Sequence, residues 1–268
     1  MFLTKKSYRK ILIIAICYFV IGTSGIVLGI VFGDVGRVDK FLIVLGILAY
    51  LLGVLFIFWG RYAEGKGKLI NLGNKLVRKE LKPAEFIKEY TYLKNSEELV
   101  IKKPSLEVLN LVIIAYDLLD DQENALATAE EMILAASEKK KTYTNLVKSS
   151  LLYAYDKKEE AEELFMETQK SKLDWMSNAL VEAILKCDRA IAFGDYAVAE
   201  AYNLKMLEQS FHKLDNLGKM MVHFKLGELY EKKQNNEKAI PYYQYCVNYG
   251  GETTLKMVAI KKLQEITR

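Results

Sequence analysis

Two long apolar runs lie within the first sixty residues of the chain, and the remainder is rich in charge. Ile11–Phe32 contains 22 residues without a charged side chain, and Phe41–Trp59 contains 19. As helices they would be about 33 and 28 Å long, against a bilayer hydrocarbon core of about 30 Å. Only eight residues separate the runs, so two spans would form a helical hairpin. The sequence therefore predicts a two-span membrane anchor in residues 1–60.

The first run is expected to stay in the protein rather than to be removed as a signal peptide. Basic residues precede it, as in a signal peptide, but no small-x-small cleavage site closes it. Cys17 does not mark a lipoprotein signal, because Ile16 occupies the position that needs a small residue. A second apolar run follows at once, which favours an uncleaved hairpin.

Basic residues lie mainly outside the loop between the two runs. Four precede the first run and seven follow the second by residue 82. Two lie in the loop Gly33–Lys40, where Asp34 and Asp39 offset them. Because Lys and Arg are enriched on the cytoplasmic side, we expect both termini in the cytoplasm. The protein is thus expected to be a multi-pass protein of the cell membrane, by default that of a bacterium.

The charge of the chain argues against a nucleic-acid partner. Residues 1–60 hold six of the 38 Lys and Arg and two of the 34 Asp and Glu, so 61–268 hold 32 of each. A neutral domain lacks the basic face that phosphate neutralisation requires. The three cysteines are scattered, which gives neither a disulfide framework nor a zinc pattern and favours a reducing compartment.

Glycines recur along one face of each apolar run, at steps of three, four or seven residues: Gly22, Gly25, Gly29 and Gly33 in the first, and Gly46, Gly53 and Gly60 in the second. Small residues let helix backbones approach closely inside a bilayer. The two stripes either pack on each other or dock another membrane subunit. The runs contain no ionisable side chain, which argues against a channel or carrier formed by the hairpin alone.

Residues 61–82 form a basic juxtamembrane segment. Basic residues near a membrane surface attract anionic lipid headgroups, at about 1 kcal/mol each. A second interpretation is equally open, namely a stop-transfer flank that continues into a helix.

From residue 83 to 268 the sequence has helix periodicity, with hardly any strand signal. Helices of about 12–18 residues fit between the breaks. The breaks are expected near Asp120-Asp121, Lys139–Lys141, Asp156–Lys158, Gly194-Asp195, Asn216–Gly218, Asn235-Asn236 and Gly250-Gly251. We predict repeats over 106–253, a less clear helical pair over 67–100 and a closing helix over 252–267. The predicted fold is all-α, a transmembrane hairpin followed by an α-solenoid.

The segments share an internal period. Alanines recur early in the second helix of each predicted helix pair, at spacings of 36, 38 and 40 residues: Ala125, Ala161, Ala199 and Ala239. The last copy reads Leu226-Gly227-x-x-Tyr230, then Ala239 and Tyr243, which resembles the tetratricopeptide repeat. The chain departs from this family in lacking the terminal proline and in a spacing longer than about 34 residues. The resemblance implies a superhelix of helix pairs with a concave groove.

In such a superhelix the first helices would line the groove. The residues expected to face it are Asn110, Asp117, Leu146, Tyr153, Ile184, Asp188, Phe224, Glu228 and Glu231. This set mixes apolar and acidic groups and lacks the paired basic residues with which family members hold a partner's terminal carboxylate. The sequence therefore favours a basic or amphipathic helical segment as ligand.

Tyrosine is the most informative residue type in the helical part, with 17 copies in the chain. Tyr242, Tyr243, Tyr245 and Tyr249 crowd the last repeat. Most tyrosines are expected to fill the seams between helices. The remainder are candidates for a recognition surface, because Tyr offers contact area with few rotatable bonds.

No arrangement of residues indicates catalysis. Gly60–Gly67 has the spacing of a phosphate-binding loop, but a membrane span precedes it and Gly67 replaces the hydroxyl residue. His212 and His223 are isolated, and no metal or nucleophile motif accompanies them. We therefore expect neither an enzyme nor a cofactor, metal or small-molecule substrate.

These observations predict a membrane-anchored scaffold or adaptor that presents a helical-repeat domain to a protein partner. Two alternatives remain open: a sensor that binds a peptide and signals through the hairpin, and an accessory subunit of a membrane enzyme or transporter that docks through the glycine faces.

Overall fold

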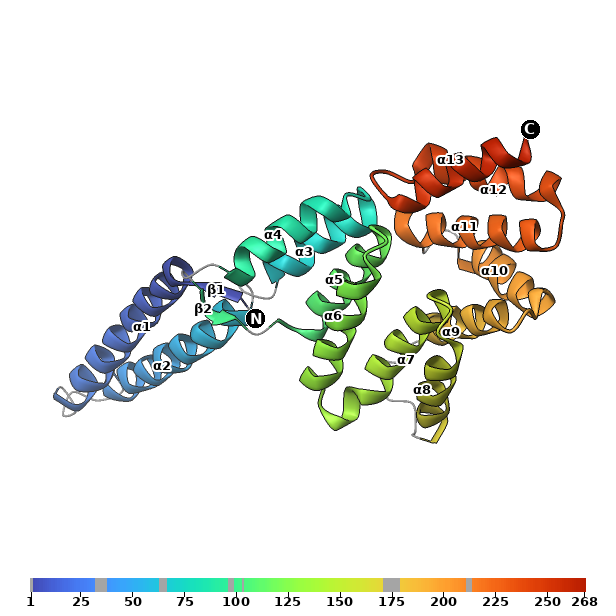
Figure 1. Ribbon diagram of the computed structural model, residues 1–268. Coiled ribbons are helices and arrows are strands. Elements are labelled where there is room, and N and C mark those ends of the chain that lie inside the picture. The colour runs from blue at the N-terminus through green and yellow to red at the C-terminus, as the bar shows by residue number, and fades with distance from the viewer. Residues whose placement is uncertain are drawn as a thin grey trace. The chain divides into compact units, whose positions relative to one another are not determined.

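The computed structural model describes residues 2–31, 38–62, 67–95, 99–102, 104–170, 179–210 and 214–268. The chain divides into two compact units. One comprises residues 1–71 and 90–105, and the other comprises 72–89 and 106–268. Within the described ranges the fold is all-α, with thirteen α-helices, one π-helical segment and two short strands (Figure 1).

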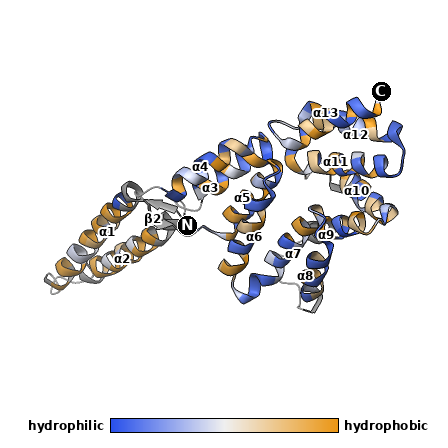
Figure 2. Cartoon of the chain, viewed as in Figure 1, coloured by the Kyte–Doolittle hydropathy of each residue, from blue (hydrophilic) through white to orange (hydrophobic). Residues whose placement is uncertain are grey.

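Two long antiparallel helices, α1 (Lys5–Val31) and α2 (Val38–Tyr62), pack side by side in the first unit (Figure 1). Apolar residues dominate both (Figure 2), and many of their large apolar side chains are exposed. Over Arg9–Leu28, α1 is long and apolar enough to cross a membrane, with a mean hydropathy of 2.6. In α2 the apolar stretch that the structure describes, Phe41–Leu55, is shorter than the predicted 41–59.

A small sheet, which helix periodicity did not predict, also belongs to this unit. Strand β1 (Phe2–Thr4) lies before α1, and β2 (Leu99–Lys102) lies nearly forty residues after α2. They pair antiparallel, with Phe2 opposite Lys102 and Leu3 opposite Ile101. The segments before and after the helical hairpin are therefore held together.

The second unit begins with the segment 72–89. The short helix α3 (Lys68–Gly73) leads into the π-helical segment η2 (Asn74–Lys79), and α4 (Pro83–Asn95) follows with its proline in the first turn, where a missing N–H costs no helical hydrogen bond. This segment contacts the C-terminal helices through three polar interactions. Arg78 forms an ion pair with Asp215 at 2.9 Å, the Asn216 side chain donates to the Lys79 carbonyl at 2.7 Å, and the Glu252 amide donates to the Leu81 carbonyl at 2.8 Å.

Nine helices follow in antiparallel order: α5 (Leu106–Leu118), α6 (Gln122–Ala135), α7 (Glu138–Ala154), α8 (Lys158–Lys170), α9 (Ala179–Ala192), α10 (Tyr196–Ser210), α11 (Asn216–Lys232), α12 (Asn236–Tyr249) and α13 (Thr254–Ile266). Neighbouring helices pack as pairs, α5 with α6, α7 with α8, α9 with α10 and α11 with α12, and α13 packs on α12. This arrangement is compatible with a helical repeat.

Two predicted breaks are misplaced. One was expected near Asn216–Gly218, but α11 begins at Asn216, directly after its N-cap residue Asp215. The other was expected at Lys139–Lys141, but α7 begins at Glu138 and runs through it. Lysine is a good helix former, and Glu138 pairs with Lys141 one turn later at 2.6 Å. The helix starts instead after Ser137, whose extended backbone makes it the N-cap residue.

The turns inside the four pairs have the same backbone geometry. Each contains one residue of positive φ, between 56° and 76°: Asp120, Asp156, Gly194 and Gln234. In each turn the next amide donates to the carbonyl five residues earlier, at 2.8 or 2.9 Å, which is the longer bond of a Schellman cap. The four turns thus repeat at the same spacings of 36, 38 and 40 residues as the alanines.

The repeated alanines are buried where the paired helices meet. Ala125, Ala161, Ala199 and Ala239 are all fully buried, each five residues after the positive-φ residue of its turn. In the second pair the Ser149 hydroxyl donates to the Ala161 carbonyl at 2.9 Å across the helix crossing. In the last pair a Cβ on Gly227 would come within 2.7 Å of the Tyr243 ring. Small residues are therefore required where the paired helices cross.

Candidate functional site

The glycines of the hairpin contact the opposite helix. A Cβ on Gly46 would lie 2.6 Å from the Gly22 carbonyl oxygen, and one on Gly25 would lie 3.3 Å from the Gly46 Cα. A Cβ on Gly53 would meet the Tyr18 side chain at 3.1 Å. Packing of the two stripes on each other accounts for these four glycines. Gly29 and Gly60 lie in helices at places where the structure does not describe the surroundings, and Gly33 lies outside the described residues.

Four of the nine residues expected to line the groove are buried. Leu146, Tyr153, Asp188 and Phe224 expose between 1% and 7% of their surface. The other five are partly exposed: Asn110, Asp117, Ile184, Glu228 and Glu231. A partner-binding role for the nine stays a prediction, and the buried four offer a partner little surface.

Asp188 is held by residues of two neighbouring helix pairs. It accepts a hydrogen bond from the Ser150 hydroxyl of α7 and forms an ion pair with Lys225 of α11. Burial lowers the pKa of Lys225, but the charge of Asp188 outweighs it and the net shift is upward. This polar ladder joins the first helices of three consecutive pairs.

The remaining acidic groups of the predicted groove differ in their partners. Asp117 accepts from the Tyr155 hydroxyl at 2.8 Å, and burial raises its pKa. Burial also raises the pKa of Glu228. For Glu231 burial opposes ionisation, but hydrogen bonds from Lys262 and Tyr243, both at 2.7 Å, lower its pKa overall. Three of the four acidic residues expected in the groove, Asp117, Asp188 and Glu231, therefore already bind side chains of the protein itself.

Carboxylates at one repeat position link neighbouring pairs. Glu162 and Glu200 each directly follow the buried alanine of their pair. Glu162 accepts two hydrogen bonds from Arg189, at 2.7 and 2.8 Å. Glu200 accepts from Tyr230 at 2.6 Å and pairs with Lys233. The same position thus binds a cation of the following helix pair in both cases.

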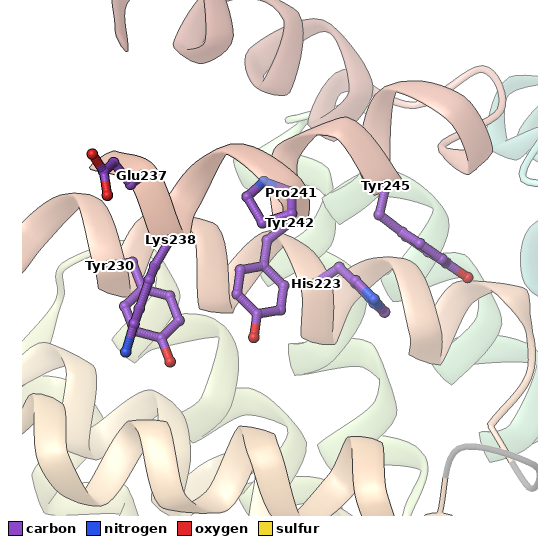
Figure 3. A pocket seen from close by; sticks show the side chains of 7 residues that line it. All are labelled: His223, Tyr230, Glu237, Lys238, Pro241, Tyr242 and Tyr245. Carbon is purple, nitrogen blue, oxygen red and sulfur yellow. The ribbon is translucent and has the colours of Figure 1, made fainter. Parts of the chain in front are cut away.

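An open pocket, with a volume of about 580 Å³, lies on the last helix pair (Figure 3). It is lined by His223 and Tyr230 of α11 and by Glu237, Lys238, Pro241, Tyr242 and Tyr245 of α12. Figure 3 shows Tyr230, Tyr242 and His223 projecting to the same side, with Lys238 lying across Tyr230 and Glu237 turned away from the rings.

The rings of the pocket form a continuous aromatic ladder with Tyr249. Tyr230 and Tyr242 are stacked, with centroids 5.5 Å apart, and His223 and Tyr245 are stacked at 3.6 Å. Tyr242 approaches His223 at 5.9 Å, and Tyr249 extends the ladder from Tyr245 at 4.7 Å. We call these five residues the aromatic ladder.

The ladder carries a cation at one end and a neutral imidazole in its middle. The Lys238 ammonium lies 5.5 Å from the Tyr230 ring centre, and that of Lys233 lies 5.9 Å from it. His223 Nδ1 is 2.7 Å from the Lys219 carbonyl, which can only accept, so Nδ1 carries the proton and Nε2 is free to accept. Burial lowers the pKa of His223, which favours this neutral form. The pocket can therefore offer rings, a hydrogen-bond acceptor and a positive charge.

Part of this site is predictable from the sequence. The crowding of tyrosines in the last repeat pointed to α12, and Lys238, Tyr242, Tyr245 and Tyr249 follow a helical face at steps of four, three and four residues. His223 looks isolated in the sequence, because its stack with Tyr245 joins two helices and leaves no local pattern. Tyr243 fills the seam instead and is fully buried.

The described residues contain no cluster of three or more His, Cys, Asp or Glu that could hold a metal ion. His212 and most of the glycine-rich stretch between α2 and Gly67 lie outside the described residues. Comparison of the chain with protein-family models, with curated proteins and with solved structures finds no match in any of the three.

Proposed function

We propose that the protein is a membrane-anchored scaffold or adaptor. A two-span hairpin holds it in the cell membrane with both termini in the cytoplasm, and degenerate tetratricopeptide-like repeats in the second unit bind a protein partner. The observation that carries the proposal is the aromatic pocket of α11 and α12. It is an open, ring-lined surface in an array where the carboxylates of Glu162, Asp188 and Glu200 are engaged in contacts between helix pairs. Aromatic side chains are enriched in protein-binding hot spots.

The pairing of β1 with β2 supports the second span. Strands can pair only if they lie on the same face of a membrane. If α1 crosses the bilayer, the chain must cross again between α1 and residue 99. Over the described part of that interval, α2 is the long apolar helix that can make the return. Both ends of the hairpin would then share one side, as the distribution of basic residues predicts.

The repeated turn supports the repeat interpretation. Four turns with the same positive-φ position, the same capping bond and the same buried alanine recur along 106–253. A superhelix of such pairs uses its surface for binding rather than for chemistry. The glycine contacts inside the hairpin make an accessory subunit docked through these faces less favourable, because Gly22, Gly25, Gly46 and Gly53 already serve the hairpin.

Cysteine labelling tests the membrane topology. In a Cys17→Ala background, Asp39→Cys would lie in the predicted outer loop and Asn95→Cys on the cytoplasmic side. A membrane-impermeant maleimide should label the first in intact cells and the second only after permeabilisation. Labelling of both in intact cells, or of neither, would rule out the proposed orientation.

Affinity purification tests the partner. The full chain, solubilised from its own membranes at native expression, should co-purify with a protein that an unrelated two-span membrane protein does not recover. Tyr249→Ala should reduce this recovery, since 62% of Tyr249 is exposed on the ladder. The matched control is Tyr92→Ala, which removes a tyrosine that is 68% exposed in the other unit. Identical recovery by the chain and by the unrelated protein would refute a scaffold or adaptor role.

A further inference from the structure

We infer that the aromatic pocket binds an extended, proline-containing peptide segment of the partner protein. The inference rests on the proposed function and gives the partner its recognition chemistry. It differs from the helical ligand that the sequence favoured for the inner groove. Three features carry it: the length of the aromatic ladder, its hydrogen-bonding groups and its charge.

The ladder has the shape that an extended peptide needs. Lys238, Tyr242, Tyr245 and Tyr249 follow one face of α12 over eleven residues, or about 17 Å. A polyproline II segment rises 3.1 Å per residue, so about five or six residues would cover this length. Such segments dock in grooves lined by aromatic rings, which pack against proline rings.

The pocket also supplies donors to a peptide backbone. A polyproline II helix makes no internal hydrogen bonds, so its carbonyl oxygens need donors from the protein that binds it. Tyr245 stacks on His223 and the Lys238 ammonium lies over the Tyr230 ring, and no hydrogen bond or ion pair of the Tyr245 hydroxyl or of Lys238 is found among the described residues. Tyr230, by contrast, already donates to Glu200. Tyr245 and Lys238 are therefore the donors available to the guest.

The charge of the pocket argues against a cationic guest. Two ammonium groups, those of Lys233 and Lys238, lie over the Tyr230 ring, and Glu237 points away from the rings (Figure 3). Glu200 forms an ion pair with Lys233 and offsets one of the two charges, so a net positive charge remains at this end. A basic side chain would meet repulsion at this end, whereas an acidic residue beside the prolines would pair with Lys238. The sequence has three prolines, widely separated, so none of its own segments is proline-rich, and we assign the segment to the partner.

A peptide-binding measurement on the full chain in nanodiscs tests the inference. The probe is a fluorescein-labelled decaproline peptide, followed by anisotropy, and a Gly-Ser peptide of equal length is its control. Decaproline should bind saturably and the control should not. Tyr245→Ala and Tyr249→Ala should each weaken binding about tenfold or more, the loss typical of an aromatic anchor. Tyr92→Ala should leave it unchanged.

A second pair of measurements tests the charge. Adding two aspartates to the end of decaproline should tighten binding to the wild-type chain, and Lys238→Gln should remove this gain without abolishing binding of plain decaproline. Far-UV circular dichroism of each variant checks folding. Because Tyr249 is largely exposed, Tyr249→Ala keeps the test valid if Tyr245→Ala unfolds.

Three results would overturn the inference: no saturable binding of decaproline, equal binding of the Gly-Ser peptide, or equal losses in Tyr92→Ala and Tyr249→Ala. None of them bears on the co-purification of a partner, so the scaffold proposal can stand while the proline inference fails. Conversely, peptide binding without any co-purifying protein would leave the pocket assigned and remove the scaffold role.

Discussion

The ion pair between Lys225 and Asp188 gives the sharpest test of how the helix pairs are held together. The Asp188 side chain is 5% exposed and that of Lys225 is 20% exposed, so the pair is largely shielded from water. Lys225→Met keeps a long unbranched side chain and removes the ammonium group, with its charge and the hydrogen bond it donates to Asp188. The Asp188 carboxylate would then keep the Ser150 hydroxyl as its donor and lose its cation.

Loss of one partner of a buried ion pair costs about 3–5 kcal/mol. The retained Ser150 donor and the partial exposure of Lys225 place the expected loss near the lower end, at about 3 kcal/mol. That is a large share of the ~5–15 kcal/mol by which a domain of this kind is stable. Removing both charges, in Lys225→Met with Asp188→Asn, should recover most of the loss, because no buried charge then remains without a partner.

Urea unfolding of the full chain in detergent micelles, followed by circular dichroism at pH 7, measures these differences. The matched control is Lys148→Met. Lys148 is 19% exposed, like Lys225, but its partner Glu130 is 60% exposed, so the expected loss is below about 1 kcal/mol. Equal urea midpoints for wild type and Lys225→Met, or no recovery in the double variant, would refute this account of the contacts among Ser150, Asp188 and Lys225.

Three further substitutions test other contacts. Glu228→Gln should stabilise the protein at pH 7, because burial raises the pKa of this carboxyl; its advantage should fade as the pH falls through that pKa, and an unchanged advantage at pH 3 would contradict it. Gly227→Ala should cost about 1–3 kcal/mol in urea unfolding by crowding Tyr243, whereas Gly67→Ala, with no atom within 4 Å, should be tolerated. Gly46→Ile should separate the hairpin helices, because even its Cβ would lie 2.6 Å from a carbonyl oxygen of α1; spin labels on the two helices would detect this, and an unchanged distance distribution would refute close packing.

The parts of the fold that the sequence predicts well are those fixed by local requirements. A crossing of two helices at close range needs a small residue, and a turn between them needs a residue that tolerates positive φ. Both leave a signal at a fixed spacing, which is why the alanines and most breaks were found. The break at Lys139–Lys141 was misplaced because charge was taken as a loop signal, although lysine favours helix.

The parts that the sequence did not predict depend on residues far apart in the chain. Strand β1 has three residues and β2 has four, too few for a periodicity, and they pair across almost one hundred residues. Likewise, the repeat alignment places Ser150 and Asp188 at equivalent positions of consecutive repeats, but it does not predict the hydrogen bond that Ser150 donates to Asp188. A groove predicted from one helix face therefore includes residues that the neighbouring helix pair covers, so the predicted surface is larger than the exposed one.

The use of charge inside the array also constrains how a partner can be recognised. The carboxylates of Glu162, Asp188, Glu200 and Glu231 each have a cation from another helix. A partner that relied on these groups would have to displace an internal ion pair and would gain little net energy. Surface ion pairs are weak as well. Affinity must then come mainly from buried ring surface, and in the described part of the helical unit the aromatic ladder joins the most rings. The internal ion pairs thus favour the aromatic ladder over the acidic groups as the proposed recognition surface.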